Sequence, residues 1–478
     1  MRFLDFSCLL AALLLSGCAA VTGLPATPAD DPLAACRTLY RETDAAVERA
    51  GVRDQGPARI SGFPYLRTNR LLASLRDGLA DDTQWSAWAG HLASLDAEAR
   101  ALELRNLSAP LAGHHPETLR DELDRCRGQL LAADLADPER RVALRDAATV
   151  ADDYVTWWRV AGLYPLTAPA VAVSIARWHA RTHAVFATPL TALPVAGGLE
   201  RWATPPGTPV DAADVQDILD RALDPLGIPL PSVADLGRLF DHFAPVWEVD
   251  VVDDDDRIGR PLPGPVVDVV QPTEYRLASH TRFVDRVLLQ LNYAVWFPAR
   301  PGNDIFAGRL DGLTWRVTLG PDGEPWMYDA IHNCGCYHNY FPTRHLRLRG
   351  DLPVFWLEPP LVPQSAPEGR PLVLRMAHAT HYLQRVYAGD PPLAAQRMAS
   401  EPYDALRSLP AGDGGRRSLF GAHGLVPGSE RPERFILWPM GIRSPGAMRQ
   451  WGRHPVAFVG RRHFDDPFLF ESLFEETP

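Results

Sequence analysis

The chain has 478 residues, 46% of them hydrophobic and 22% charged, which is typical of a globular protein with a substantial core and suits two or three domains. Its formal net charge is −11, and its 48 basic residues are all arginines that show no cluster on one segment. Nucleic-acid binding depends on clustered basic side chains that neutralise phosphates, so this composition argues against a nucleic-acid partner.

An apolar run close to the N-terminus indicates an exported chain. It extends from Phe6 to Leu15, with Arg2 before it and the small residues Ser16 and Gly17 after it. A bilayer core of about 30 Å needs about twenty apolar residues, so this run is too short to span it. A short basic end, a short apolar run and small residues before a cleavage point are typical of a signal peptide. We therefore expect residues 1–17 to be removed.

The four residues Leu15-Ser16-Gly17-Cys18 resemble the lipobox of bacterial lipoproteins. The resemblance covers only these positions, and it implies that Cys18 is acylated and becomes the first residue of the mature protein. Two or three acyl chains hold a protein stably at a membrane, whereas one chain alone is marginal. Ala19 follows the cysteine where lipoproteins kept in the inner membrane often carry Asp, which implies the outer membrane, facing the periplasm. The alternative is an ordinary secretory leader with a chance cysteine.

Residues 18–31 are predicted to be a tether, and residues 32–243 a helical domain. Apolar residues recur at spacings of three and four, as in amphipathic helices, over 33–47, 71–79, 85–104, 119–135 and 140–160. The very apolar stretch 164–199 contains four prolines. We expect its first part, as far as His183, to be a buried helix and the rest a loop. Contact with a membrane surface is the alternative for this stretch.

Residues 244–478 are predicted to form a β-rich domain, because the apolar period changes from helical to two. The expected strands are 246–252, 266–270, 286–297, 314–319, 326–331, 354–357 and 372–376. The sequence Gly320-Pro-Asp-Gly323 predicts a hairpin between two of them, since proline presets φ and Gly323 tolerates a positive φ. A helix-rich half followed by a strand-rich half predicts an α+β fold or two separate domains.

Six cysteines are present. Cys8 leaves with the leader and Cys18 carries the lipid, so four remain, and four cysteines allow three pairings. An oxidising periplasm permits disulfides. Because Cys36 and Cys126 both lie on predicted helices of the first domain, we expect a structural disulfide between them. Cys334 and Cys336 are then left as a local pair.

The segment His332-Asn-Cys334-Gly-Cys336-Tyr-His338 places four potential metal ligands on alternate positions. Thiolate and imidazole are ligands that Zn²⁺ prefers. One extended strand cannot supply all four, because it would span about 20 Å, but a bend at Gly335 would bring the two sulfurs together. One flanking histidine and a remote one would complete the set. The remote candidates are His280, His345, His378 and His381, and Asp329 is the nearest carboxylate for a general base.

Two alternatives to zinc remain open for this cluster. Cys334 and Cys336 can form a tight disulfide, which makes the protein a non-catalytic envelope or assembly lipoprotein. One of them can instead be a nucleophile, since Asn333-Cys334 followed by aromatic residues resembles cysteine hydrolases and acyltransferases of the papain-like kind. That chemistry needs an imidazole and an orienting group, for which the candidates are His378 or His381 with Asp329 or Asn339.

The chain has no GxSxG elbow, no Walker A loop and no GxGxxG motif. The sequence therefore gives no support to nucleotide binding or to the usual serine hydrolases. We expect an envelope lipoprotein with a Cys/His zinc site, structural or hydrolytic, and the sequence leaves undecided whether it is an enzyme.

Overall fold

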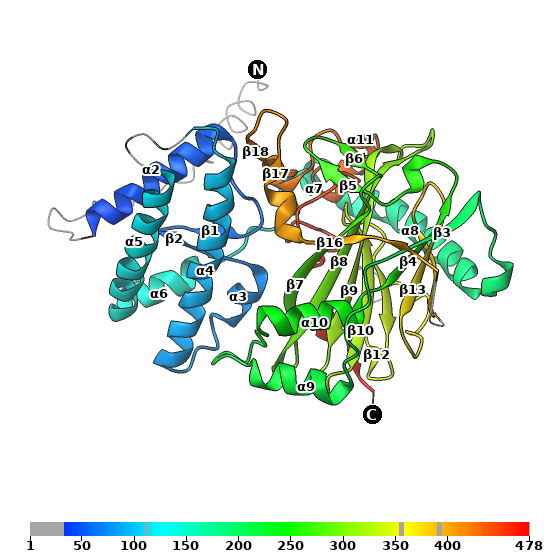
Figure 1. Ribbon diagram of the computed structural model, residues 1–478, viewed down its shortest axis with the longest axis horizontal. Helices are drawn as coiled ribbons and strands as arrows, with labels where there is room; N and C mark the ends of the chain where they lie inside the picture. The colour runs from blue at the N-terminus through cyan, green and yellow to red at the C-terminus, as the bar shows by residue number, and fades with distance from the viewer. Residues whose placement is uncertain are drawn as a thin grey trace, which may run out of the picture.

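The computed structural model describes residues 33–477, except positions 110, 112, 114, 353–357 and 390–393. The chain has the predicted α+β organisation, with a helical region followed by a β-rich region. In Figure 1 helices α2 to α6, with the short strands β1 and β2, lie on one side of the molecule and the larger sheets on the other. The predicted signal peptide, Cys18, the tether and the predicted strand 354–357 lie outside the described residues.

Residues 33–150 form what we call the helical half. Its elements are α2 (Ala34–Ala50), β1 (Ala58–Ile60), β2 (Phe63–Thr68), α3 (Arg70–Leu75), α4 (Asp82–Asn106), α5 (Pro116–Ala136) and α6 (Pro138–Ala147). The core of this half includes Tyr40, Trp88 and Leu92, each with no exposed surface. Helix α4 begins at Asp82, three residues before the predicted period, because the side chain of Asp81 accepts a hydrogen bond from the Gln84 backbone amide and so caps the first turn.

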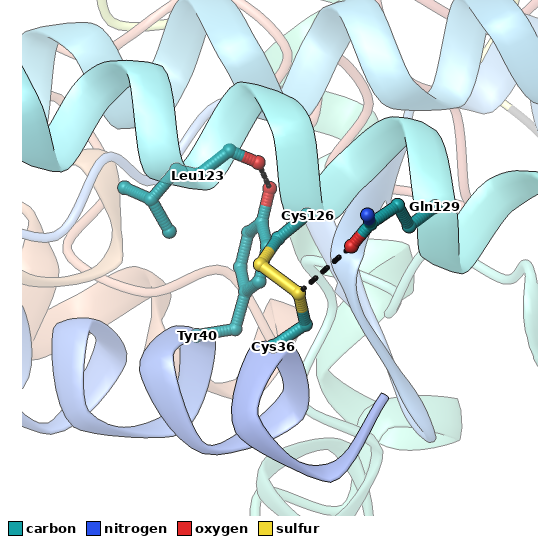
Figure 2. Close-up of a disulfide and its surroundings, with 5 residues drawn as sticks. All are labelled: Cys36, Tyr40, Leu123, Cys126 and Gln129. Atoms are coloured by element: carbon teal, nitrogen blue, oxygen red, sulfur yellow. Dashed lines mark hydrogen bonds between the residues drawn. A yellow bond between two sulfur atoms is a disulfide. The ribbon is translucent and has the colours of Figure 1, made fainter. Parts of the chain in front are cut away.

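A disulfide joins the first helix to the fourth, as the sequence predicts. Cys36 on α2 is bonded to Cys126 on α5, across a sequence separation of 90 residues. Figure 2 shows the bond beside Tyr40, whose hydroxyl donates a hydrogen bond of 2.9 Å to the backbone carbonyl of Leu123 on α5. The bond and the tyrosine together fix α2 against α5.

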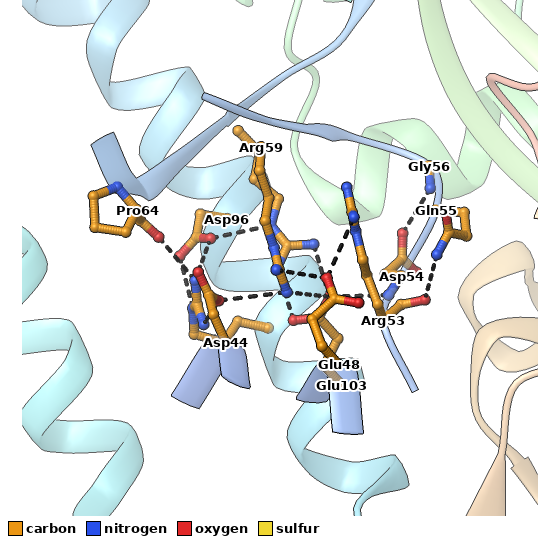
Figure 3. A network of polar contacts seen from close by, with 12 residues as sticks. Asp44, Glu48, Arg53, Asp54, Gln55, Gly56, Arg59, Pro64, Asp96 and Glu103 are labelled. Carbon is orange, nitrogen blue, oxygen red and sulfur yellow. Dashed lines mark hydrogen bonds and ion pairs between the residues drawn. The ribbon is translucent and has the colours of Figure 1, made fainter. Parts of the chain in front are cut away.

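Buried ion pairs connect β2 to α4. Arg67 on β2 donates to Glu103 and to Asp96, and all three side chains are fully buried. Arg100, one turn along α4, also bonds to Asp96 and donates to the carbonyl of Pro64. Figure 3 shows the acidic members of this network between the helices. Because each buried charge has an opposite partner, the network does not leave an uncompensated charge in the core.

The chain changes its packing partners near Tyr154, well before the predicted boundary at residue 243. The predicted helix 140–160 is two helices, α6 and α7 (Thr156–Ala161), separated by residues 148–155. Most of the core residues after residue 154 pack with the sheets, although Ile228 belongs to the core of the helical half. We call 154–477 the β-rich half. Helices α9 (Ala212–Arg221) and α10 (Val233–Phe243) contribute Ile218 and Phe240 to the same core as the sheets.

The prediction of a buried helix to His183 is wrong in its burial. Helix α8 (Tyr164–Ala187) is present, but only Ala168 and Phe186 in it are buried. Leu166 and Val173 are 74% and 51% exposed. None of the described helices combines the length and the apolar character that a bilayer crossing requires.

The larger sheet has six strands in the order β11-β10-β9-β8-β7-β16. They are β7 (Thr273–Phe283), β8 (Arg286–Arg300), β9 (Gly308–Leu319), β10 (Pro325–His332), β11 (Asn339–Pro342) and β16 (Ala399–Pro402). The predicted hairpin at 320–323 is confirmed: β9 and β10 pair antiparallel, and Gly323 has φ +76°.

The second sheet has five strands in the order β14-β13-β4-β3-β15. They are β3 (Gly198–Ala203), β4 (Val246–Val251), β13 (Leu372–Met376), β14 (Leu383–Ala388) and β15 (Gln396–Arg397). The two sheets share one apolar core, to which β4 contributes Trp247, β8 Tyr293 and β9 Trp315. The chain passes directly from β15 to β16, so a single segment forms an edge of each sheet.

The shorter elements of the β-rich half surround these sheets. They are β5 (Arg260–Leu262), β6 (Val266–Asp268), β12 (Leu346–Leu348), β17 (Leu409–Pro410), β18 (Arg416–Arg417), α11 (Arg434–Leu437), η5 (Trp438–Met440), α12 (Leu469–Leu473) and β19 (Phe474–Glu476). Leu469 and Phe470 of α12 pack with Met327 and Tyr340 on the face of the larger sheet that is turned away from the shared core.

Removal of the disulfide tests how far the helical half depends on it. The double change Cys36→Ser and Cys126→Ser should lower the free energy of unfolding by about 4–5 kcal/mol, because a bond that closes so long a loop restricts the unfolded chain. Urea unfolding followed by circular dichroism measures the loss. A reductant should lower the free energy of unfolding of the wild-type protein by the same amount, and it should leave that of the double variant unchanged. A wild-type urea midpoint that is the same with and without the reductant would contradict this prediction.

Candidate functional site

The segment 332–336 forms a tight turn at the end of β10. Gly335 has φ +87°, so the chain bends where the sequence predicts. The Gly335 amide donates to the His332 carbonyl at 2.7 Å, and the His332 amide donates to the Cys336 carbonyl at 3.0 Å. A Cβ atom at position 335 would lie 2.9 Å from the Pro455 carbonyl oxygen. Glycine is therefore required by both the backbone conformation and the close approach of the chain.

The two histidines of the predicted zinc site are turned toward carboxylates and make no hydrogen bond to the two sulfurs. The His332 ring lies 3.2 Å from Asp311, measured from Nδ1 to the carboxylate, and the His338 ring lies 2.7 Å from Asp329. Side chains alternate along a strand, so Asp329 and His332 on β10 point to opposite faces of the sheet. Within the described parts of the chain, no group of three or more His, Cys, Asp or Glu side chains is placed to hold a metal ion. The four side chains are not gathered around one point in this structure, and zinc stays a prediction.

Cys334 and Cys336 are both free and buried. They pack in an apolar cluster with Trp296, Leu310 and Met448. Burial opposes loss of the Cys334 proton, but the hydrogen bond from Cys336 and the positive charge of Arg431 outweigh it, so the pKa of Cys334 lies below its usual value. The same hydrogen bond, with burial, raises the pKa of Cys336.

Asp311 lies at the centre of a buried polar network beside this turn. Its two carboxylate oxygens contact His332 and His381, at 3.2 and 3.0 Å, and Arg431 lies 3.3 Å away. Burial alone would raise the pKa of Asp311, but these positive and polar neighbours hold it well below its ordinary value. None of these four side chains has more than 2% of its surface exposed.

The network continues from His381 to the acidic turn at 253–256. His381 Nε2 lies 3.6 Å from Asp256, which also accepts from His378 at 2.7 Å. Burial lowers the pKa of His332, whereas the carboxylates on both sides of His381 outweigh burial and raise the pKa of that ring. Negative carboxylates therefore alternate with imidazoles along a largely buried series of polar contacts.

Strained backbone marks the same region. Leu310, Tyr337, Ala379 and His381 have φ between 50° and 62°. Non-glycine residues in this left-handed conformation cost of order 1–3 kcal/mol and persist where surrounding contacts fix them. Leu310 and Tyr337 adjoin Asp311 and Cys336 in the sequence, and the Ala379 amide donates a hydrogen bond to Asp256. The network holds the turn in place, and Asp311 at its centre is fully buried.

The remaining predicted residues lie apart from the two thiols. His280 Nε2 contacts the Pro229 carbonyl at 2.8 Å, and burial lowers its pKa to about 4. The His345 ring stacks on Trp326. Among the described residues, no histidine is hydrogen-bonded to either sulfur.

The pairings expected for a cysteine hydrolase are likewise not assembled. Asp329 bonds to Arg316 at 2.6 Å as well as to His338. The Asn339 amide group donates to the Tyr337 carbonyl. His378 instead contacts the Asp256 carboxylate, and His381 contacts the Asp311 carboxylate.

A cleft between the helical half and the larger sheet was not predicted from the sequence. Its volume is about 360 Å³. Helix α4 lines one wall with His91, Ser94 and Glu98, which are spaced to share one helix face. The rest of its lining includes Asn69, Arg70, Ser279, His280, Gln290, Tyr403, Asp404, Arg407, Gln450, Trp451 and Asp465. These positions are far apart in the sequence, so no local motif identifies them.

Ion pairs border the cleft. Asp54 accepts from Arg407 at 2.7 Å and from Gln450 at 3.1 Å, which ties the helical half to the β-rich half. Arg70 pairs with Asp153 at 2.8 Å and with Asp465 at 3.3 Å. Because the guanidinium groups are already matched by carboxylates, the cleft has no strong excess of positive charge.

Two side chains in the wall of the cleft have no partner. Among the described residues, Ser94 and Glu98 make no hydrogen bond or ion pair, and both are exposed. Partial desolvation in the cleft and the nearby Asp404 carboxylate raise the pKa of Glu98. Both groups therefore have hydrogen-bonding capacity that a ligand can use.

Comparisons of the chain with known protein families, with curated proteins and with solved structures gave no match.

The state of the two thiols distinguishes the three chemistries predicted for the turn. We expect both Cys334 and Cys336 to be free and to react with an alkylating reagent only after denaturation, because both are buried. Peptide mass mapping of alkylated protein, with zinc analysis of the same sample, measures this.

Each competing outcome has its own signature. One zinc per chain that is lost in Cys334→Ser would confirm the zinc prediction and contradict the donor arrangement described above. A bridged peptide that resists alkylation until reduced would indicate the disulfide. Rapid alkylation of one thiol in the native protein would indicate a nucleophile.

Proposed function

We propose that this is a lipid-anchored protein of the bacterial envelope that binds a neutral, polar small molecule, such as a saccharide, in the cleft between its two halves. The observation that carries the ligand-binding part is the cleft itself. Its volume of about 360 Å³ falls within the range of small-molecule sites, which occur preferentially where two structural units meet.

The lining of the cleft favours a neutral ligand over a charged one. Arg70 and Arg407 are each paired with two carboxylates. An anionic ligand would have to compete with these carboxylates, and a cationic ligand would approach guanidinium groups. Hydroxyl groups of a neutral ligand can donate to Glu98 and exchange hydrogen bonds with Ser94, the two unpartnered groups in the wall.

Aromatic side chains supply the apolar part of such a site. Tyr403 and Trp451 line the cleft from the β-rich half. The Tyr403 hydroxyl accepts a hydrogen bond of 2.9 Å from the Trp451 backbone amide, which fixes the two residues together. An aromatic face beside several polar groups suits the mixed surface of a sugar ring, since few convergent polar groups in an apolar lining provide orientation and specificity.

The envelope location rests on the resemblance of residues 15–18 to a lipobox. The disulfide between Cys36 and Cys126 supports export, because disulfides persist in oxidising compartments such as the periplasm. A zinc ion held by Cys334 and Cys336 remains a second proposal. The observation in its favour is that the bend at Gly335 carries both thiols into the same buried cluster.

Ligand binding is tested with a panel of neutral oligosaccharides, including chitotetraose and maltotetraose, by saturation-transfer NMR and tryptophan fluorescence. We expect at least one member to bind. Trp451→Ala should weaken its affinity at least tenfold, since the loss of an aromatic contact of about 1.4 kcal/mol or more corresponds to that factor. Glu98→Gln should also weaken it.

The matched control is Trp157→Ala, which removes a tryptophan that is 67% exposed and does not line the cleft. It should leave saccharide affinity unchanged. Absence of binding across the panel, or binding that tolerates Trp451→Ala and Glu98→Gln, would refute the proposed ligand class.

The anchor is tested independently of the cleft. Mass spectrometry of the membrane-bound protein should find Cys18 acylated at the N-terminus of the mature chain. Cys18→Ala should leave the protein either unprocessed or released from the membrane in a salt wash. A mature, firmly membrane-bound form of Cys18→Ala would contradict the anchor at this residue.

A further inference from the structure

One face of the β-rich half exposes large apolar side chains from several elements. Those that are 60% exposed or more are Trp157, Val160, Leu163, Leu166, Phe435 and Ile436. We call this set the α7–α8–α11 surface. Single exposed apolar residues are normal, but a contiguous exposed patch marks a site of interaction with a protein or a membrane.

These side chains belong to one face because their elements pack on each other. The Val155 amide, just before α7, donates to the Gly441 carbonyl at 2.7 Å, and Arg159 on α7 donates to the Met440 carbonyl at 2.8 Å. Ala168 of α8 packs against the same Met440. The turn η5 follows α11 directly and thus lies between α7, α8 and α11. In Figure 1, α8 and α11 lie on the side of the molecule opposite the helices α2 to α6.

Helix α8 has the composition of a helix that lies on a membrane surface. It carries apolar side chains on its exposed as well as its inner side, and its exposed charged residues, Arg177 and Arg181, are basic. A helix that is exposed along most of its length in a water-soluble protein normally carries polar residues of both signs on its outer face.

The charge of this region differs from that of the whole chain. No Asp or Glu occurs between Tyr154 and Leu199, although the chain contains 59 acidic residues and has a net charge of −11. On α11, Arg434 lies over the exposed ring of Phe435. Arginines beside exposed aromatic and aliphatic side chains match a surface of anionic lipid headgroups above acyl chains.

We propose that the α7–α8–α11 surface docks on an anionic lipid bilayer, with its apolar side chains in the headgroup region and Arg177 and Arg181 against lipid phosphates. Trp157 and Phe435 then occupy the interfacial layer, where amphipathic rings are favoured. A second copy of the chain fits this face less well, because a two-fold contact would bring the arginines of both copies into one interface to which residues 155–198 contribute no acidic partner. The inference goes beyond ligand binding in the cleft, and it does not depend on acylation of Cys18.

The test uses the full chain carrying Cys18→Ala, so that no acyl chain contributes. Cosedimentation is measured with vesicles of phosphatidylethanolamine and phosphatidylglycerol and with vesicles of phosphatidylcholine alone. The double change Phe435→Ser and Ile436→Ser should reduce binding to the anionic vesicles about tenfold or more, because two large apolar side chains no longer leave water. The segment before residue 18 is the same in both chains, so its contribution cancels.

A matched control removes equally exposed apolar side chains elsewhere. Val233 and Val270 are 92% and 84% exposed and lie outside this surface, so Val233→Ser with Val270→Ser should leave vesicle binding unchanged. In a second arm, Arg177→Glu with Arg181→Glu should abolish the preference for anionic vesicles and reduce the salt dependence of binding. Near-ultraviolet circular dichroism checks that each variant is folded.

Three outcomes would overturn the proposal. One is equal binding of the Phe435/Ile436 variant and the unsubstituted chain. Another is an equal loss of binding in the Val233/Val270 control. The third is a dimer in sedimentation velocity that the same Phe435/Ile436 substitutions dissociate, since the surface would then be covered by a second copy.

Discussion

A continuous chain of buried hydrogen bonds between the two halves sets the geometry on which the cleft depends. Arg67 on β2 bonds to Glu103 on α4, and Glu103 also accepts from the Asp54 backbone amide. The Asp54 carboxylate then bonds to Arg407 and Gln450 in the β-rich half. Because these charges are buried, removal of one side chain leaves the charge of its partner unpaired, which is strongly unfavourable. The width of the cleft is therefore fixed by the same interactions that stabilise the helical half.

The buried network around Asp311 has a comparable role in the β-rich half. It gathers residues from β9, β10 and the turn after β13, and four residues with a strained backbone, His381 among them, lie in it or beside it. A polar network in a core is tolerated when its charges and hydrogen bonds are matched, and it then favours one arrangement over others. The turn at 332–336 is shaped by this network and by Gly335, and the two thiols are carried into an apolar cluster as a result.

The α+β order, the hairpin at 320–323, the disulfide and the bend at Gly335 were predictable from sequence, because each depends on local pattern or on the conformational freedom of a few residues. The orientations of the side chains of the four predicted zinc ligands were not predictable from sequence. Which carboxylate a histidine contacts depends on strand alternation and on distant partners such as Asp311. The exposure of α8 was mispredicted because apolar content indicates burial only when something covers the helix. The cleft could not be predicted, since its lining residues, from Asn69 to Asp465, become neighbours only in the folded chain.

The passage from β15 to β16 has a consequence for biogenesis. Gln396 and Arg397 complete one side of the smaller sheet against β3, and Ala399–Pro402 complete one side of the larger sheet against β7. As the chain emerges into the compartment where it folds, about two hundred residues follow β3 before its neighbour β15 emerges. Until then β3 and β7 each have unpaired amide and carbonyl groups, the condition under which strands join those of other molecules. The emerging chain should therefore need a holding chaperone until residue 402 is available, and truncations just before residue 394 should aggregate even though most of the core sequence is present.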